Sequence, residues 1–338
     1  MAFPTDQAVS RLGQVNASGD ARALFLKLFS GEILSAFEER NIFMPLHRVR
    51  TIQNGKSAQF PLTGVATAKY HTPGQLIEAD KIKHAERVVT VDDLLISSTF
   101  ISNIDEAMNH YDVRSIYTRE MGYALANAAD KNVARIVAKA ASITDATAAA
   151  TQFGASFDDE VYTSNVTIGA LTADAVDGAK IAKAIYDALE EFDKKDITQE
   201  KIVVLPPQQY YALFGADQSV NTLAYMNRDV GGSGSIATGA APTIGGARVV
   251  MSNHIPTTDE STTGATPDPL TNTGAYKADY SAVRGLVFTQ DAAATVKLLD
   301  LGVENEYQIE RQGNLMVAKY AMGHNILRPA CAISLNAA

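Results

Sequence analysis

The chain contains 338 residues, of which 46% are hydrophobic and 20% are charged, and its formal net charge is −9. That balance predicts a globular protein, and the length is sufficient for two packed units or one elongated unit. A net acidic chain argues against nucleic-acid binding by the whole surface, because such binding depends on Lys and Arg that neutralise phosphates. Cys331 is the single cysteine, which excludes an internal disulfide and cysteine-based zinc sites and fits folding inside a cell.

The first 45 residues are predicted to form an arm followed by a helix. Residues 1–22 are largely polar and lack the apolar run of a signal peptide, so we expect a flexible arm. In residues 23–45, apolar side chains recur every four positions from Phe25 to Phe37. This spacing predicts an amphipathic helix.

Residues 46–91 form a long excursion between two predicted helices. The dipeptide Asn54-Gly55 predicts a tight hairpin between residues 47–53 and 56–61, and residues 83–91 predict a returning extended segment. Connections within compact domains are usually about four to six residues long. We therefore expect this segment to lie on something outside its own domain.

The charge distribution gives the excursion a possible partner. Between Leu46 and Thr90 there are seven basic and three acidic residues, a difference of +4, whereas residues 150–310 carry 10 basic and 22 acidic residues, a difference of −12. Two interpretations stay open: these are solvated surfaces of opposite sign, or the basic segment docks on the acidic region of a neighbouring copy.

Residues 102–142 predict one long helix, a spine for the chain. Apolar residues recur at spacings of three and four, no proline interrupts the segment, and Ser102 is a suitable N-cap. Its five acidic and five basic residues exclude a membrane span.

The rest of the chain predicts a small α/β domain and further strands. Helices are expected at 172–192, capped by Thr172, and at 208–214; strands are expected at 201–205, 247–252, 283–289, 294–301 and 313–322, before a last apolar run at 330–335. Residues 231–246 and 257–274 are expected to be loops.

No constellation of residues predicts an active site. The glycine-rich loop lacks the Lys-Ser/Thr of a phosphate-binding loop, and paired carboxylates such as Asp92-Asp93 have no supporting histidine. His110 and Asp112 are better explained by structural hydrogen bonds on the spine helix than by acid–base catalysis. We therefore predict no catalytic residue, no metal site and no cofactor.

Four long strings resemble a known family. They are ALFLKLFSGEILSAF at 23–37, GKSAQFP at 55–61, AMNHYDVRS at 107–115 and AKYAMGHNILRP at 318–329. In order and spacing they closely resemble the major capsid proteins of short-tailed phages of the T-seven type, from about residue 20 to the end of the chain.

The resemblance implies an α+β fold of the Hong Kong ninety-seven capsid type. It implies an N-terminal arm at 1–22, an N-terminal helix at 23–45, an extended β-hairpin loop at 46–91, a peripheral domain with the spine helix at 92–150 and 305–338, and an axial α/β domain at 151–304. The expected inter-subunit contacts of the extended loop are Arg48, Arg50, Lys56, Lys81, Lys83 and Arg87. The expected framework of the spine helix is His110, Tyr111, Asp112 and Arg114.

The resemblance also implies a structural role in a virion. The expected partners are copies of the chain in hexamers and pentamers of an icosahedral head, a scaffolding protein during assembly, a portal protein at one vertex, and packaged double-stranded DNA enclosed without sequence-specific binding; no membrane is expected. The implied location is the virion capsid, assembled in the cytoplasm of a host bacterium. Two alternatives are an encapsulin-like nanocompartment shell of the same fold and an α/β enzyme with a mobile basic lid.

Overall fold

The computed structural model of the chain describes residues 42–63, 66, 68–77, 79, 82, 84–104, 114–143, 165–213, 243–261 and 275–338. In that part of the chain the α-helices are α2 (Arg114–Ala141), α4 (Gly178–Lys194) and α5 (Pro207–Ala212), and the short 3-10 helices are η2 (Met44–Leu46), η3 (Thr172–Val176), η5 (Ile309–Arg311) and η6 (Pro329–Cys331). The strands are β1 (Arg48–Thr51), β2 (Ser57–Thr63), β3 (His84–Thr90), β4 (Leu95–Ser102), β5 (Asn165–Ile168), β6 (Ile202–Leu205), β7 (Thr243–Ile244), β8 (Ala247–Met251), β9 (Val283–Phe288), β10 (Ala293–Gln308), β11 (Gly313–Ile326) and β12 (Ala332–Ala337).

The chain divides into two compact units. Unit 1 includes Asp93–Ala129 and Leu298–Met322, and unit 2 includes Ile42–Asp92, Asp130–Lys297 and Gly323–Ala338. Helix α2 and strands β10 and β11 therefore contribute residues to both units. None of the helices within the described residues is long and apolar enough to cross a membrane.

Unit 2 is built on a sheet with the strand order β5-β12-β9-β6-β8-β7, as far as the described residues show. Successive residues of its central strands point to opposite faces, so each strand supplies two cores. Ile202 and Val204 of β6 face one core, and Val203 and Leu205 face the other. A strand that is buried on both faces must be apolar throughout, which explains the sequence IVVL at this position.

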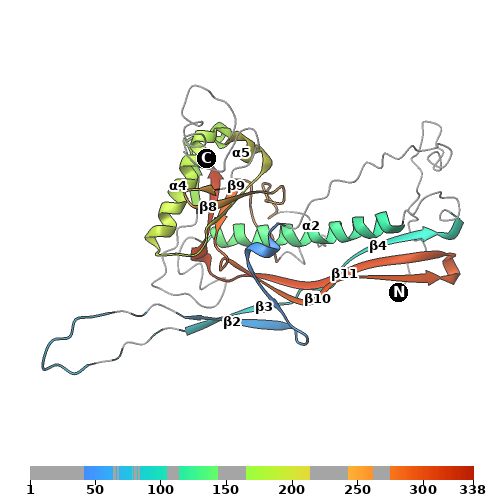
Figure 1. Cartoon of the computed structure of the whole chain (residues 1–338), viewed down its shortest axis with the longest axis horizontal. Helices are drawn as coiled ribbons and strands as arrows, with labels where there is room; N and C mark the ends of the chain where they lie inside the picture. The colour runs from blue at the N-terminus through green and yellow to red at the C-terminus, as the bar shows by residue number, and fades with distance from the viewer. Residues whose placement is uncertain are drawn as a thin grey trace. The chain divides into compact units, whose positions relative to one another are not determined.

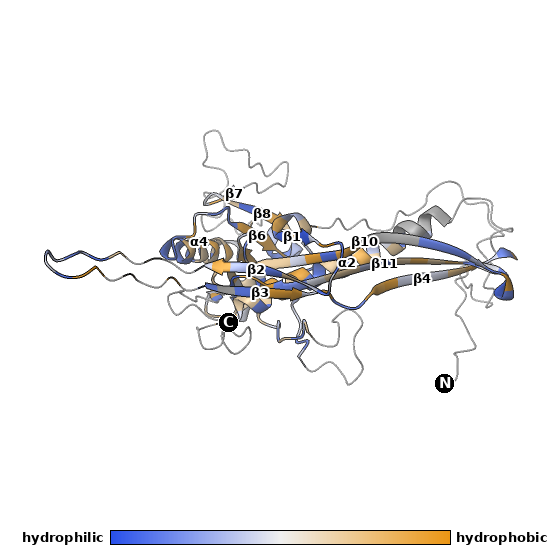
Figure 2. Ribbon diagram, turned by 90° about the horizontal axis from the view of Figure 1, so that it is seen from below, coloured by the Kyte–Doolittle hydropathy of each residue, from blue (hydrophilic) through white to orange (hydrophobic). Residues whose placement is uncertain are grey.

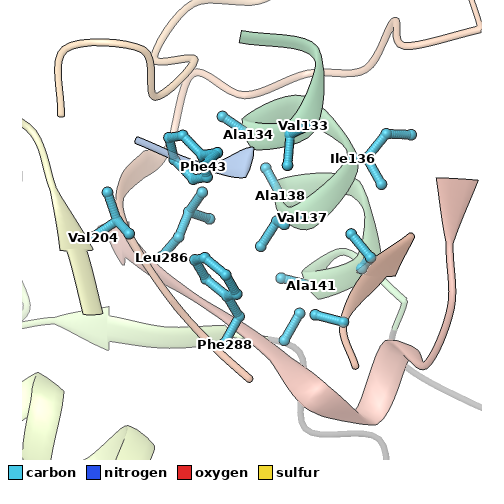
Figure 3. Close-up of a cluster of buried hydrophobic side chains, with 14 of the residues drawn as sticks. Phe43, Val133, Ala134, Ile136, Val137, Ala138, Ala141, Val204, Leu286 and Phe288 are labelled. Carbon is cyan, nitrogen blue, oxygen red and sulfur yellow. The ribbon is translucent and has the colours of Figure 1, made fainter. Parts of the chain in front are cut away.

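The second half of α2 covers one face of this sheet. Figure 3 shows Val133 and Val137 of α2 turned toward Val204, Leu286 and Phe288 of the strands. The ring of Phe43 stacks on that of Phe288, with centroids 6.1 Å apart. Alanines fill much of this half of the helix, at positions 134, 138, 140 and 141, and their small side chains allow the sheet to approach closely.

Helix α4 covers the other face of the sheet. Its apolar stripe includes Ile181, Ile185 and Phe192, all fully buried, and Figure 2 shows both hydrophobic and hydrophilic residues around its axis. The predicted cap at Thr172 is wrong: residues 172–176 form η3, and α4 begins after Asp177, whose side chain accepts a hydrogen bond from the Ala179 amide at 2.9 Å. Asp is a strong N-cap, and Asp177 sits directly before the apolar periodicity begins.

The predicted hairpin across Asn54-Gly55 is also wrong. Strand β1 pairs in parallel with β10, from Arg48 opposite Ala294 to Thr51 opposite Lys297, and β2 pairs antiparallel with β3. Gly55 does have the positive φ expected of a turn, at 109°. Its turn passes the chain from one sheet to another, because β1 finds its hydrogen-bond partner far away in the sequence.

Unit 1 contains the pairing of β4 with β11. The register runs antiparallel from Ser102 opposite Gly313 to Leu95 opposite Tyr320. The described sheet to which both strands belong has the order β1-β10-β11-β4. The last part of the predicted spine helix is confirmed as α2; residues 103–104 are helical, and 105–113 lie outside the described residues.

The compact units differ from the predicted domain boundaries at the C-terminus. Residues 305–338 were grouped with 92–150, but β12 lies between β5 and β9 in the six-stranded sheet of unit 2. The predicted arm and most of the N-terminal helix, residues 1–41, lie outside the described residues.

A buried carboxylate connects three segments of unit 2. Asp130 of α2 is fully buried and accepts hydrogen bonds from the amides of Ile42 at 2.5 Å and Phe43 at 3.2 Å. Nδ1 of His254 lies 3.2 Å from the same carboxylate. A buried charge is tolerated only where such donors surround it.

We expect Asp130→Ala to lower the free energy of unfolding by about 3–5 kcal/mol, because it removes the buried carboxylate that accepts from the amides of Ile42 and Phe43 and contacts His254. Urea unfolding measures this change. Asp187→Ala is the matched control, since Asp187 pairs with Lys183 on the surface of α4. Equal effects of the two changes would contradict the anchoring role of Asp130.

Candidate assembly loop

The chain between β2 and β3 presents apolar side chains to solvent. The strands lie side by side, with Ser57 opposite Thr90 and Thr63 opposite His84 (Figure 1). Beyond them, Tyr70, Leu76 and Ile77 are 105%, 88% and 78% exposed. Values this high mean that the side chains contact almost nothing in their own chain. Three such residues within eight positions indicate an interaction surface rather than scattered surface hydrophobics.

The root of this loop, in contrast, is packed in an apolar cluster. Ala58 and Val89 lie opposite each other on β2 and β3 and pack with Ala294 and Val296 of β10 and with Leu327. All of these residues are buried. The loop thus leaves the body of unit 2 from a fixed base.

Close backbone contact adds to the anchoring of the root. A Cβ atom on Gly323 of β11 would lie 1.9 Å from the carbonyl oxygen of Thr90 and 2.9 Å from Cα of Val91. Only glycine allows β11 to approach the end of β3 this closely. Nearby, Asn325 donates from Nδ2 to the Val88 carbonyl at 3.2 Å.

The four described residues of the six predicted loop contacts do not form one cluster. Arg48 forms an ion pair with Asp291, and Arg50 donates to the Gln59 carbonyl at 2.9 Å, both within the chain. Arg87 is buried, with 6% of its surface exposed, and Lys56 is exposed. Lys81 and Lys83 lie outside the described residues. Their inter-subunit role stays a prediction, and the side chain best placed to test it is Lys56.

The predicted framework of the spine helix falls mostly outside the described residues. This applies to His110, Tyr111 and Asp112, whereas Arg114 is the first residue of α2.

Sequence reasoning missed a buried hydrogen-bond relay at the loop root. Nδ1 of His47 lies 2.7 Å from the Phe43 carbonyl, Nε2 of His47 lies 2.5 Å from Oγ1 of Thr295, and that oxygen lies 2.7 Å from Nδ1 of His324. A carbonyl can only accept, so His47 carries its proton on Nδ1 when neutral, and Thr295 donates to Nε2. His324 must then donate from Nδ1 to Thr295.

Both histidines are held in the neutral form. Burial lowers the pKa of His47 to about 4, against smaller raising effects of the Phe43 carbonyl and Asp130. Burial also lowers the pKa of His324 to about 3, with further lowering by His47 and Lys297. His324 lies inside β11, and its side chain makes the contact with Thr295. Nothing in the sequence indicates that residues 47, 295 and 324 meet.

Comparisons with known proteins show the family of this chain. Residues 59–336 match the family model described as Gp10A-like, major capsid protein. The chain belongs to this family of major capsid proteins. It is 34% identical to the major capsid protein of Escherichia phage T7 over 334 residues, which cover 94% of this chain and 93% of that protein. It is 32% identical to the major capsid protein of Enterobacteria phage T3, with 95% and 93% covered.

Solved structures support the same assignment. The capsid structure of Cyanophage P-SCSP1u has a TM-score of 0.74 and 38% sequence identity, covering 98% of this chain and 99% of that chain. The mature capsid of bacteriophage PhiM1 has a TM-score of 0.71 over 100% and 99% of the two chains, and at 20% identity it supports the fold alone. The predicted α+β fold of the Hong Kong ninety-seven capsid type is confirmed. The resemblance to the major capsid proteins of short-tailed phages is confirmed as well. These neighbours are phage capsids, so the phage interpretation is preferred to the nanocompartment.

We expect Gly323→Ala to destabilise unit 2 strongly, because the added methyl group meets backbone atoms of Thr90 and Val91 that cannot rotate away. Gly246→Ala is the control: its added methyl group meets nothing within 4 Å, and only the positive φ of 82° adds a cost of about 1–2 kcal/mol. Thermal unfolding of the two variants compares them. A smaller loss for Gly323→Ala than for Gly246→Ala would contradict the close approach of β11 to the loop root.

We also expect the free energy of unfolding to fall as the pH drops below about 6.5, the ordinary pKa of histidine. In that range the unfolded chain binds protons at positions 47 and 324, whereas the folded chain does not until about pH 4 and about pH 3. Protons therefore favour the unfolded state, by about 3 kcal/mol from His47 alone once the pH reaches its folded pKa.

Urea unfolding at about pH 7 and about pH 5 tests this dependence, a range chosen to limit the titration of ordinary carboxylates. His47→Asn and His324→Asn should each flatten it, and His71→Asn, at an exposed loop position, should not. An unchanged slope in both buried variants would show that the relay does not carry the effect.

Proposed function

We propose that the chain assembles with copies of itself into hexamers and pentamers of an icosahedral phage head, with each extended loop lying on a neighbouring copy. The observation that carries this proposal is the contrast within the loop: its root is buried, and Tyr70, Leu76 and Ile77 beyond it are almost fully exposed. Burying a side chain of this size contributes about 1.5–3 kcal/mol, so three of them supply a substantial contact.

The names of the relatives support the wider setting. The matched proteins are major capsid proteins of phages T7 and T3. We infer that the head encloses double-stranded DNA without sequence-specific binding, and that a scaffolding protein acts during assembly and a portal protein occupies one vertex. The proposed location is the virion, after assembly in the bacterial cytoplasm. The chain acts as a structural protein rather than as an enzyme.

Within that shell we assign the spine helix to a peripheral domain and residues 151–304 to an axial domain. We also assign the C-terminal strand to the axial domain, an assignment supported by the place of β12 in the sheet of unit 2. When a loop of each copy contacts a different surface of the next copy, the contact repeated around a rotation axis closes into a ring.

We expect the combined change Tyr70→Ser, Leu76→Ser and Ile77→Ser to leave the subunit folded and to abolish or strongly reduce shell formation. The replaced side chains are exposed in the single chain, so the thermal unfolding midpoint of the subunit should not fall. Negative-stain electron microscopy counts closed shells, and circular dichroism checks folding.

The matched control replaces Lys183 and Asp187, an exposed pair on α4, with serine. It should assemble normally. Normal shells from the loop variant would refute the docking role of the loop. An unassembled small species from the unmodified chain, with and without a scaffolding protein, would refute the shell function itself.

A further inference from the structure

A cavity opens at one edge of the six-stranded sheet, away from the extended loop. Its volume is about 540 Å³, and it is lined by Pro206, Pro207, Gln208, Gln209, Asn253, Ile255, Thr257 and Arg284. All of these residues belong to unit 2. The volume lies in the range of about 300–1,000 Å³ that is usual for ligand sites, and it suits a few residues of an extended chain rather than a folded domain.

The topology of the sheet places this cavity where binding sites form. Strands β6 and β8 are parallel, and both end here: Pro206 and Pro207 follow β6, and Asn253 follows β8 by two residues. The antiparallel strand β9 begins at the same edge and supplies Arg284. In open α/β sheets, ligands bind outside the carboxyl ends of parallel strands, where loops diverge.

The walls of the cavity are fixed before any ligand arrives. The Ser252 amide donates to the Leu205 carbonyl at 2.9 Å, and the Ser252 hydroxyl accepts from the His254 amide at 3.1 Å. His254 contacts the buried Asp130 of α2, and Ile255 is buried in the core that α2 covers. A site that is already in its final shape loses little entropy on binding.

Arg284 is the charged group of the cavity, and it is held in one orientation. Its Nη1 donates to the carbonyls of Ser281 and Val283, both at 2.8 Å. Among the described residues, Nε and Nη2 have no acceptor, and the described lining of the cavity contains no Asp or Glu. Five other cations of the unit do pair with a carboxylate: Lys180, Lys183, Lys194, Lys201 and Arg135.

Arg284 is half-buried, and the described residues give it no counterion, although residues 150–310 carry a net charge of −12. The guanidinium fork matches a carboxylate, which it binds in bidentate geometry. The remaining lining groups suit a peptide: the amides of Gln208 and Asn253 and the hydroxyl of Thr257 can pair with a backbone, and the prolines and Ile255 offer apolar contact.

We propose that this cavity binds an acidic segment of a partner polypeptide, with a Glu or Asp side chain on Arg284. The site does not include the extended loop. A failure of peptide binding would therefore not refute the proposed shell function, and a failure of assembly would not refute peptide binding.

Fluorescence anisotropy with the full chain tests the proposal. The probe is a capped, dye-labelled peptide, Ala-Glu-Val-Glu-Ala, and the comparison peptide has Gln in place of both Glu residues. We expect the acidic peptide to bind about tenfold tighter or more, since hydrogen bonds to charged groups are stronger than those to neutral groups. Arg284→Gln should remove that difference.

Arg248→Gln is the matched control, because Arg248 is an exposed arginine of β8 in the same unit, outside the cavity lining. It should keep the preference for the acidic peptide. Asn253→Asp, at an exposed position on the cavity rim, should weaken binding of the acidic peptide by repulsion even if Arg284→Gln fails to fold.

Three results would overturn the proposal. The acidic and amide peptides could bind equally or not at all; the two arginine variants could lose equal affinity, which indicates diffuse electrostatics; or free glutarate could compete as well as the unlabelled peptide, which indicates a small carboxylate site.

Discussion

The carboxylate of Asp130 is the constraint on which unit 2 depends. It lies on the spine helix and has no exposed surface. Its oxygens accept hydrogen bonds from the amides of Ile42 and Phe43, in the segment that leads into the extended loop. They also contact His254, which lies in another loop. A buried charge leaves its partners little freedom, because each donor that moves away exposes an unpaired ion to an apolar core. One side chain therefore fixes both the base from which the loop departs and one wall of the cavity at the sheet edge.

The extended loop has a buried root and exposed apolar side chains farther out. Its root is held by apolar packing around Ala58 and Val89, by the close approach at Gly323 and by the relay from His47 to His324. Farther out, the side chains of Tyr70, Leu76 and Ile77 are almost fully exposed. Folding alone does not reward such exposed apolar side chains, whereas association with another copy does. A rigid root also lowers the entropy lost when the loop docks, since its direction is already set.

Several charged side chains are paired within the chain. Arg48 pairs with Asp291, and Arg135 donates two hydrogen bonds of 2.8 and 3.0 Å to Glu260. The inter-subunit role expected of Arg48 stays a prediction. The described loop exposes both apolar side chains, such as Leu76 and Ile77, and basic ones, such as Lys56. Arg284 has no carboxylate partner among the described residues, and the proposed acidic segment would supply one.

The sequence by itself determined the elements whose pattern is local or whose burial is complete. The apolar run at 202–205 predicts a strand, since both of its faces are covered, and the three- and four-residue spacing predicts the spine helix as far as Ala141. The long strings shared with a capsid family predicted the fold and the family, both confirmed by the comparisons.

Only the tertiary structure decided which distant residues meet. Asn54-Gly55 is a strong local hairpin signal, but hydrogen bonding of β1 to β10, more than 240 residues away, overrode it. The partners of Asp130, the relay through Thr295 and the setting of Arg284 also join segments far apart in the chain. Residue types and spacings encode the period of a helix or strand, whereas contacts of this kind depend on how whole elements pack, so one sequence read alone does not contain them.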